Sequence, residues 1–89
     1  MIRRRVIYRG AVQGVGFRWT ALRAASGGAV TGYVRNLADG GVELVVEGEA
    51  AEVAALVAEI EERLREYFGR REAEESVATG EFSGFEIRR

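Results

Sequence analysis

The sequence predicts an α+β fold in which the order β-α-β-β-α-β forms an antiparallel sheet with both helices on one face. Three observations lead to this prediction. Short runs rich in β-branched and aromatic residues alternate with two segments of helical periodicity, and an Asp-Gly pair at 39–40 marks a tight hairpin. No repeat or low-complexity linker interrupts these segments. Residues 1–89 are therefore expected to form one domain around one core.

The first half of the chain is expected to contain a strand, a short helix and a hairpin. The run RVIYRGAV at 5–12 reads as a strand that ends at glycines. From Phe17, the sequence FRWTALRAAS repeats apolar residues at helical spacing and stops at Ser26, Gly27 and Gly28. Residues 29–37 and 41–48 are both strand-like, and the Asp-Gly signal at 39–40 joins them as a hairpin.

The strand at 41–48 has a two-residue alternation, which predicts one sheet face that is covered and one that is open to water. The covered side would carry Val42, Leu44 and Val46, and the open side Glu43, Val45 and Glu47. The covering elements must then be the helices.

A long amphipathic helix is expected over residues 50–68. Its apolar stripe consists of Val53, Leu56, Val57, Ile60, Leu64 and Phe68. Its solvated side would carry three i,i+4 ion pairs, Glu59–Arg63, Glu61–Arg65 and Glu66–Arg70.

The tail has the weakest pattern. A weak strand is expected within residues 70–80, with Ala73, Val77 and Ala78 as its buried candidates, followed by a turn and a short strand at Phe82, Phe85 and Ile87. This order of elements is that of the ferredoxin-like α/β sandwich.

Composition excludes several kinds of chemistry. The chain has no cysteine and no histidine, which removes disulfides, thiolate nucleophiles, Cys-ligated zinc and the usual general base. We therefore expect no metal and no cofactor. A net charge of −1 argues against a nucleic-acid surface, and no apolar run is long enough to span a membrane. Because the start MIRRRVIY also lacks a secretory signal, we expect a cytoplasmic protein.

The stretch AVQGVGFRW at 11–19 joins the first strand to the first helix. Its glycines allow successive backbone N–H groups to converge, and the start of the helix adds unpaired N–H groups of its own. Arg18 supplies a planar fork of donors that suits two phosphate oxygens, and no acidic residue occurs before position 39. On spacing alone, the stretch fits either a plain turn or an anion-binding loop.

Asn36 is the only asparagine of the chain and leaves two readings open. It could simply end its strand, because asparagine tolerates turn geometry. Beside a bound phosphate, its amide could instead position a nucleophilic water. Asp39 is the only nearby carboxylate, and its Asp-Gly position is explained by the hairpin rather than by a role as a base.

Two motifs resemble the signatures of the acylphosphatase family. GAVQGVGFRW is similar to the first signature and GYVRNLADGGVELVVEG to the second, and the likeness continues to the ending FSGFEIRR. The resemblance implies the ferredoxin-like sandwich. It also implies hydrolysis of the carboxyl-phosphate bond of acyl phosphates to a carboxylate and inorganic phosphate, without a metal or a covalent intermediate.

The resemblance also implies roles for individual residues. Arg18 matches the arginine that binds the phosphoryl group together with the backbone amides of Gln13, Gly14, Val15, Gly16, Phe17 and Arg18. Asn36 matches the asparagine that orients the attacking water. The C-terminal carboxylate of Arg89 would approach Arg18, and Gln13 would act through its backbone more than through its side-chain amide. The protein is expected to be a monomer.

Two other functions are considered. One is an acylphosphatase-like module that binds phosphate or carbamoyl phosphate without free turnover. The other is an RNA-binding module with the same element order, which would need stacked aromatics on its central strands. The strand at 41–48 has no aromatic residue and two glutamates, which argues against RNA.

Overall fold

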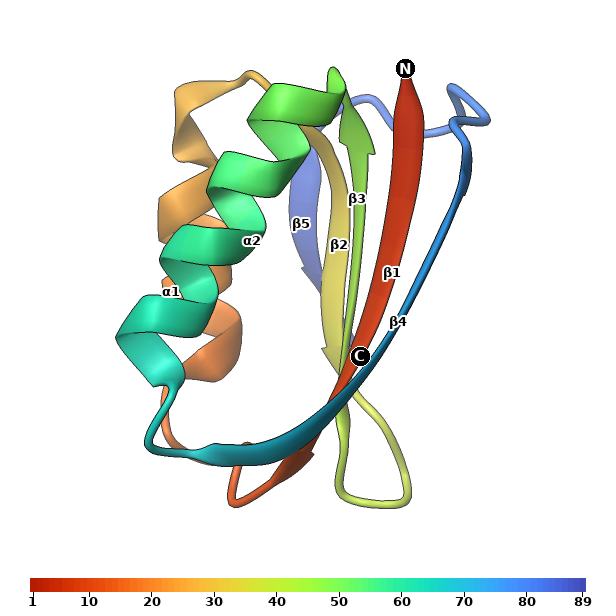
Figure 1. The fold of residues 1–89 in the computed structure, drawn as a ribbon. Coiled ribbons are helices and arrows are strands. Elements are labelled where there is room, and N and C mark those ends of the chain that lie inside the picture. Colours follow the sequence, from red (N-terminus) through yellow and green to blue (C-terminus); the bar gives the residue numbers. More distant parts are fainter.

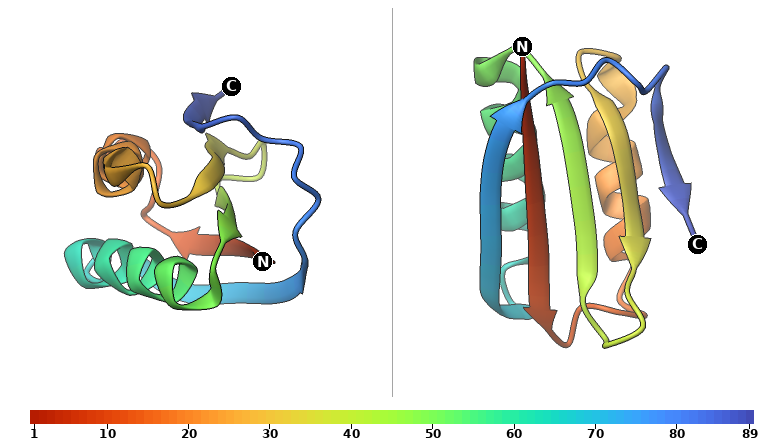
Figure 2. Two further views of the ribbon diagram at one scale, coloured as in Figure 1. Left: turned by 90° about the horizontal axis from the view of Figure 1, so that it is seen from above. Right: turned by 90° about the vertical axis from the view of Figure 1, so that its right-hand side faces the viewer.

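A computed structural model describes residues Met1–Arg89. Two helices pack on one face of a five-stranded sheet whose strand order is β4-β1-β3-β2-β5 (Figures 1 and 2). The elements are β1 Ile2–Gly10, α1 Phe17–Ala24, a 3₁₀ turn Ala25–Gly27, β2 Thr31–Asn36, β3 Val42–Gly48, α2 Ala50–Leu64, β4 Phe68–Val77 and β5 Phe85–Arg88. The predicted α+β sandwich with both helices on one face is confirmed. Neither helix is long and apolar enough to cross a membrane.

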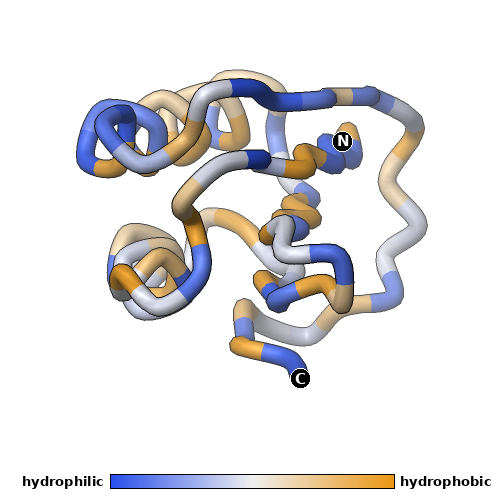
Figure 3. The backbone as a smooth tube through the Cα atoms, turned by 90° about the horizontal axis from the view of Figure 1, so that it is seen from below, coloured by the Kyte–Doolittle hydropathy of each residue, from blue (hydrophilic) through white to orange (hydrophobic).

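The core lies between the helices and the sheet. Both hydrophobic and hydrophilic residues occur in each helix, as the orange and blue segments of Figure 3 show. The core contains the expected stripe of α2 up to Leu64 and the expected inward side of β3, together with Tyr8 of β1 and Phe17 of α1. The rings of Tyr8 and Phe17 lie 4.9 Å apart between centroids. Because full burial of a side chain such as Phe17 contributes about 1.5–3 kcal/mol, this packing stabilises the start of α1 against the end of β1.

The sheet is mixed rather than antiparallel, which corrects one part of the prediction. β5 lies parallel to β2 at one edge, whereas every other neighbouring pair is antiparallel. The tail therefore adds a fifth strand beyond β4. The carboxyl ends of β2 and β5 consequently lie at the same end of the sheet.

β4 is longer and more regular than the sequence pattern indicates. It pairs with β1 from Ile2↔Val77 to Gly10↔Phe68. Across this ladder Arg4 pairs with Glu75 at 2.9 Å and Arg9 with Glu72 at 3.2 Å. Opposite charges on facing strands thus support an edge strand that has no apolar alternation. Ala73 and Val77, which were expected to be buried, are exposed on this edge, and Ala78 is only half-buried.

The end of α2 also differs from the prediction. The helix ends at Leu64, the Tyr67 N–H closes a turn onto the Leu64 carbonyl at 2.9 Å, and Phe68 begins β4. Because Phe68 packs against the Tyr8 ring, its apolar side chain belongs to the sheet and not to the helical stripe.

Only one of the three predicted helical ion pairs is present. Glu59 and Arg63 pair at 3.2 Å, as expected. The other two are absent because β4 begins early: Glu61 pairs with Arg71 of β4, Arg65 pairs with Glu62 at 3.5 Å, and Arg70 is itself part of β4. Glu61 thus pairs with Arg71 of the neighbouring strand rather than with Arg65 of its own helix.

The sheet face away from the helices is not open to water, which corrects the prediction for β3. Glu43 and Glu47 are only 2% and 3% exposed. The segment between β4 and β5 runs along the far side of the sheet from the helices (Figure 2). Its Thr79 and Gly80 N–H groups donate to Glu47 at 2.9 and 3.0 Å. This segment therefore covers Glu47, at one end of the face that alternation alone assigns to solvent.

Three arginines from the two strands beside β3 complete this covered face. Arg5 and Arg35 each donate to Glu43 at 2.6 Å, and Arg3 donates to Glu47 at 2.7 Å. The two buried carboxylates are therefore paired and hydrogen-bonded, which is the condition for burying a charge without a large cost.

Candidate functional site

The loop of residues 11–16 and the β2–β3 hairpin meet at one end of the sheet (Figures 1 and 2). The loop leaves β1 and enters α1, while Asn36 is the last residue of β2. A hollow of about 210 Å³ lies between them and is lined by Val12, Gly14, Gly16, Phe17, Arg18, Trp19 and Asn36. The structure therefore brings Arg18 and Asn36, which are distant in the sequence, to the same hollow.

The backbone of the loop has free donors beside this hollow, which Gly14 and Gly16 line. Gly14 and Gly16 both have a φ of 81°, a left-handed conformation that residues with a Cβ rarely adopt. None of the N–H groups of residues 13–16 donates to a backbone or side-chain acceptor of the protein. Four unpaired N–H groups therefore adjoin the positive end of α1, an arrangement that favours an anion.

Arg18 stands in the first turn of α1 and is half-buried. It makes no ion pair and no hydrogen bond within the protein, whereas Arg5, Arg9 and Arg35 all bind carboxylates. No acidic residue occurs in the first turn of α1. The guanidinium is thus available to a ligand in the hollow.

The expected contact between Arg18 and the C-terminal carboxylate is not present as an ion pair. β5 does run parallel to β2, so that the chain ends at the same end of the sheet as Asn36. Near the end of the chain, Arg88 instead pairs with Glu86 at 3.6 Å.

The side chain of Gln13 makes contacts that the sequence did not indicate. Its side-chain Nε2 donates to the carbonyls of Leu37 at 2.8 Å and Gly41 at 2.9 Å. The amide therefore connects the loop to the hairpin that follows Asn36, while the expected role of the Gln13 backbone stays a prediction. Sequence reasoning missed this contact because it joins residues 24 and 28 positions apart.

Asp39 is a hairpin residue, as predicted. Its Oδ1 accepts a hydrogen bond from the Gly41 N–H at 3.0 Å, and its Oδ2 pairs with Arg9 at 2.6 Å. The hydrogen bond from Arg9, followed by that from the Gly41 N–H, lowers the pKa of Asp39. A carboxylate held in its ionised form by these partners is a poor acceptor for a proton.

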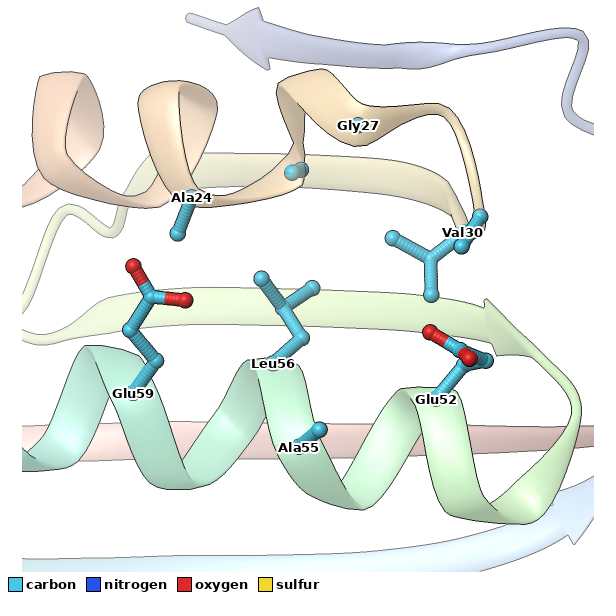
Figure 4. A pocket seen from close by; sticks show the side chains of 9 residues that line it. Ala24, Gly27, Val30, Glu52, Ala55, Leu56 and Glu59 are labelled. Carbon is cyan, nitrogen blue, oxygen red and sulfur yellow. The ribbon is translucent and has the colours of Figure 1, made fainter.

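A second hollow, of about 160 Å³, lies between the two helices and does not suit an anion. Figure 4 shows Glu52 and Glu59 beside the apolar side chains of Val30 and Leu56. No arginine lines it, so its carboxylates would repel a phosphate. The described chain also contains no group of three His, Cys, Asp or Glu side chains arranged to hold a metal ion.

Known proteins resemble this chain over its whole length. The acylphosphatase family model matches residues 4–87. An acylphosphatase of Methylococcus capsulatus is 45% identical over 91 aligned residues, which cover 100% of this chain and 98% of that protein.

Solved structures agree with this match. The crystal structure of an acylphosphatase from Bacillus subtilis superimposes with a TM-score of 0.86 at 28% identity and full coverage of both chains. The HypF protein of T. kodakarensis superimposes with a TM-score of 0.82 at 31% identity, covering 100% of this chain but 12% of that one. By sequence and by structure, the chain belongs to the acylphosphatase family.

Proposed function

We propose that acyl phosphate hydrolysis, the function of this family, takes place in the hollow between residues 13–18 and Asn36. The observation that carries this proposal is that unpaired N–H groups, an unpaired arginine and an asparagine side chain all border one hollow. The substrate is a small molecule, and the products are a carboxylate and inorganic phosphate.

The phosphoryl group would be bound by the loop and by Arg18. The N–H groups of residues 13–16 and the start of α1 offer donors to phosphoryl oxygens, and the Arg18 fork offers two more. Such fixed donors stabilise the charge that develops on the phosphoryl oxygens as the bond to the acyl oxygen breaks.

Asn36 would orient the attacking water. Its carbonyl oxygen can accept a hydrogen bond from the water and its NH₂ can donate to a phosphoryl oxygen. The water oxygen forms the new bond to phosphorus, the bond from phosphorus to the acyl oxygen breaks, and the carboxylate leaves with the electron pair. One proton of the water passes to a phosphoryl oxygen of the substrate, and the other stays on the attacking oxygen, so that the product is dihydrogen phosphate. No protein base is required, which agrees with the pairing of Asp39 to Arg9.

Hydrolysis of benzoyl phosphate tests this assignment. The wild type should remain active with a chelator present, as metal-independent catalysis requires. Arg18→Ala should lose at least about 10² in kcat/KM, because loss of one oxyanion donor typically costs that much. The matched control is Arg23→Ala, since Arg23 lies in the last turn of the same helix and away from the hollow, and this variant should keep wild-type activity. Full activity in Arg18→Ala would contradict the assignment.

A second candidate is a phosphate or carbamoyl phosphate-binding module without free turnover. The likeness to a segment of the much longer HypF chain favours considering it. Saturable binding of inorganic phosphate combined with no hydrolysis of benzoyl phosphate would support this candidate, whereas turnover would exclude it. The monomeric state and the cytoplasmic location stay predictions, and sedimentation of the purified protein tests the first.

A further inference from the structure

We infer that the side-chain amide of Gln13 is a positioning group that fixes Asn36 relative to the phosphate-binding loop. The inference rests on the proposed function, because it concerns how the two halves of that site are held together. Gln13 belongs to the loop by its backbone, and its side chain reaches the hairpin.

Both donors of the Gln13 amide are used in this contact. A glutamine NH₂ group has two donors, and in Gln13 each has an acceptor: the Leu37 carbonyl at 2.8 Å and the Gly41 carbonyl at 2.9 Å. Leu37 directly follows Asn36, and Gly41 directly precedes β3. The amide therefore holds both ends of the turn that begins at Asn36.

No other hydrogen bond joins residues 11–16 to residues 37–41. The remaining bonds of the hairpin are internal: Leu37 N–H to Gly41 at 2.8 Å, Gly40 N–H to Leu37 at 3.2 Å, and Gly41 N–H to Asp39 at 3.0 Å. Asp39 also holds Arg9, which lies in β1 and not in the loop. Gln13 is thus the single polar connection between the loop and the turn.

This connection sets the distance between the phosphoryl group and the water. The loop would fix phosphorus, Asn36 would fix the water, and their separation decides whether the water can attack in line. Because a misplacement of about 1 Å can cost about 10²-fold in rate, loss of the connection should reduce turnover far more than binding.

The first test is Gln13→Ala, assayed with benzoyl phosphate and with inorganic phosphate as inhibitor. We expect kcat to fall about 10- to 10²-fold, while KM and the inhibition constant of phosphate change less than about 3-fold, because Arg18 and the loop N–H groups remain. An inhibition constant that rises as much as kcat falls would overturn the inference, since the amide would then support binding.

The second test is a double-mutant cycle with Asn36→Ala. If Gln13 acts through Asn36, adding Gln13→Ala to Asn36→Ala should lower kcat by less than about 2-fold further. A full, additive loss in the Asn36→Ala background would overturn the inference.

Gln13→Glu keeps the length of the side chain and gives a pH readout. Above its pKa the carboxylate cannot donate and faces two carbonyl oxygens. Below its pKa it regains one O–H donor. The ratio of Gln13→Glu to wild-type kcat should therefore rise as the pH falls below about 5, and a ratio that is flat with pH would contradict the inference.

Asp39→Asn is the matched control, because Asp39 braces the same turn from Gly41 without touching the loop. Its kcat should stay within about 2-fold of the wild type. A loss equal to that of Gln13→Ala would overturn the inference, because it would show that any weakening of the turn lowers kcat.

Arg18→Ala separates the two proposals. If that variant keeps full activity, the proposed function fails. If Arg18→Ala is inactive but a folded Gln13→Ala keeps the wild-type kcat, only the present inference fails.

Discussion

Arg18 and Asn36 are expected to have different roles, with Arg18 binding the phosphoryl group and Asn36 positioning the water. Arg18 has no ion pair within the protein, so its charge is available to a ligand in the hollow. Asn36 carries no charge and borders the same hollow from the end of β2. Binding and water positioning should therefore be separable by mutation.

Substitution of Asn36 by alanine tests this division. We expect kcat for benzoyl phosphate to fall by about 10² or more, because the amide acts on the water in the transition state. Inhibition by inorganic phosphate should stay close to that of the wild type. Equal losses of turnover and of phosphate inhibition would instead show that Asn36 binds the phosphoryl group.

At the scale of elements, the candidate site is formed by the loop of residues 11–16, the start of α1 and the end of β2. Gly16 is the N-cap of α1 and has a left-handed φ of 81°, so it sets both the direction of the loop amides and the start of the helix. A Cβ at this position would meet no atom within 4 Å, and the cost of a side chain there is one of conformation and not of space.

Gly16→Ala should therefore weaken phosphate binding without blocking the hollow. The left-handed conformation costs an L-residue about 1–2 kcal/mol, and relief of this strain would turn the loop amides away from their common centre. Gly27→Ala is the control, because Gly27 has a negative φ and an equally open surrounding. Isothermal titration with phosphate measures both; unchanged affinity in Gly16→Ala would contradict the role given to the loop backbone.

The fold is stabilised by the core and also by the buried carboxylates Glu43 and Glu47 on the sheet face away from the helices. Burial alone would raise the pKa of Glu47, but hydrogen bonds from the Thr79 N–H, Arg3, the Gly80 N–H and the Thr79 hydroxyl together lower it to about 2. At Glu43, burial likewise acts to raise the pKa. The hydrogen bonds from Arg5 and Arg35 outweigh this effect, so the pKa of Glu43 is lowered. Both carboxylates are more acidic in the folded state than in the unfolded chain.

This difference predicts a loss of stability in acid. A group with a depressed folded pKa stabilises the fold fully above its unfolded pKa, and that stabilisation disappears as the pH falls toward the folded pKa. The free energy of unfolding should therefore decrease between about pH 5 and pH 2. Urea titrations over this range should show a shallower decrease in Glu47→Gln, which should also be less stable than the wild type at neutral pH by about 1–3 kcal/mol. An identical pH profile in both proteins would contradict the contribution of Glu47.

The parts of the fold that the sequence predicted are those with local signals. The Asp-Gly hairpin, the helix start at Phe17 and the inward residues of β3 follow from turn chemistry and periodicity. β4 could not be predicted in the same way, because its charges are satisfied across strands by partners such as Arg4 and Arg9. The burial of both Glu43 and Glu47 depends on arginines of the neighbouring strands. Glu47 is covered in addition by a segment more than thirty positions away in the sequence.

The site shows the same division. Arg18, Asn36 and the loop glycines could be chosen from sequence because their residue types suit phosphate chemistry and their motifs resemble a family. The side chain of Gln13 could not, because its role is visible only once the loop and the hairpin lie together.

The most direct test of the phosphate-binding loop is an NMR titration of the ¹⁵N-labelled protein with inorganic phosphate. The amide resonances of residues 13–18 should shift together and saturate at the concentration at which phosphate inhibits hydrolysis, and these shifts should be lost in Arg18→Ala. Saturating shifts elsewhere, with the amides of residues 13–18 unmoved, would contradict the assignment of this loop as the phosphoryl site.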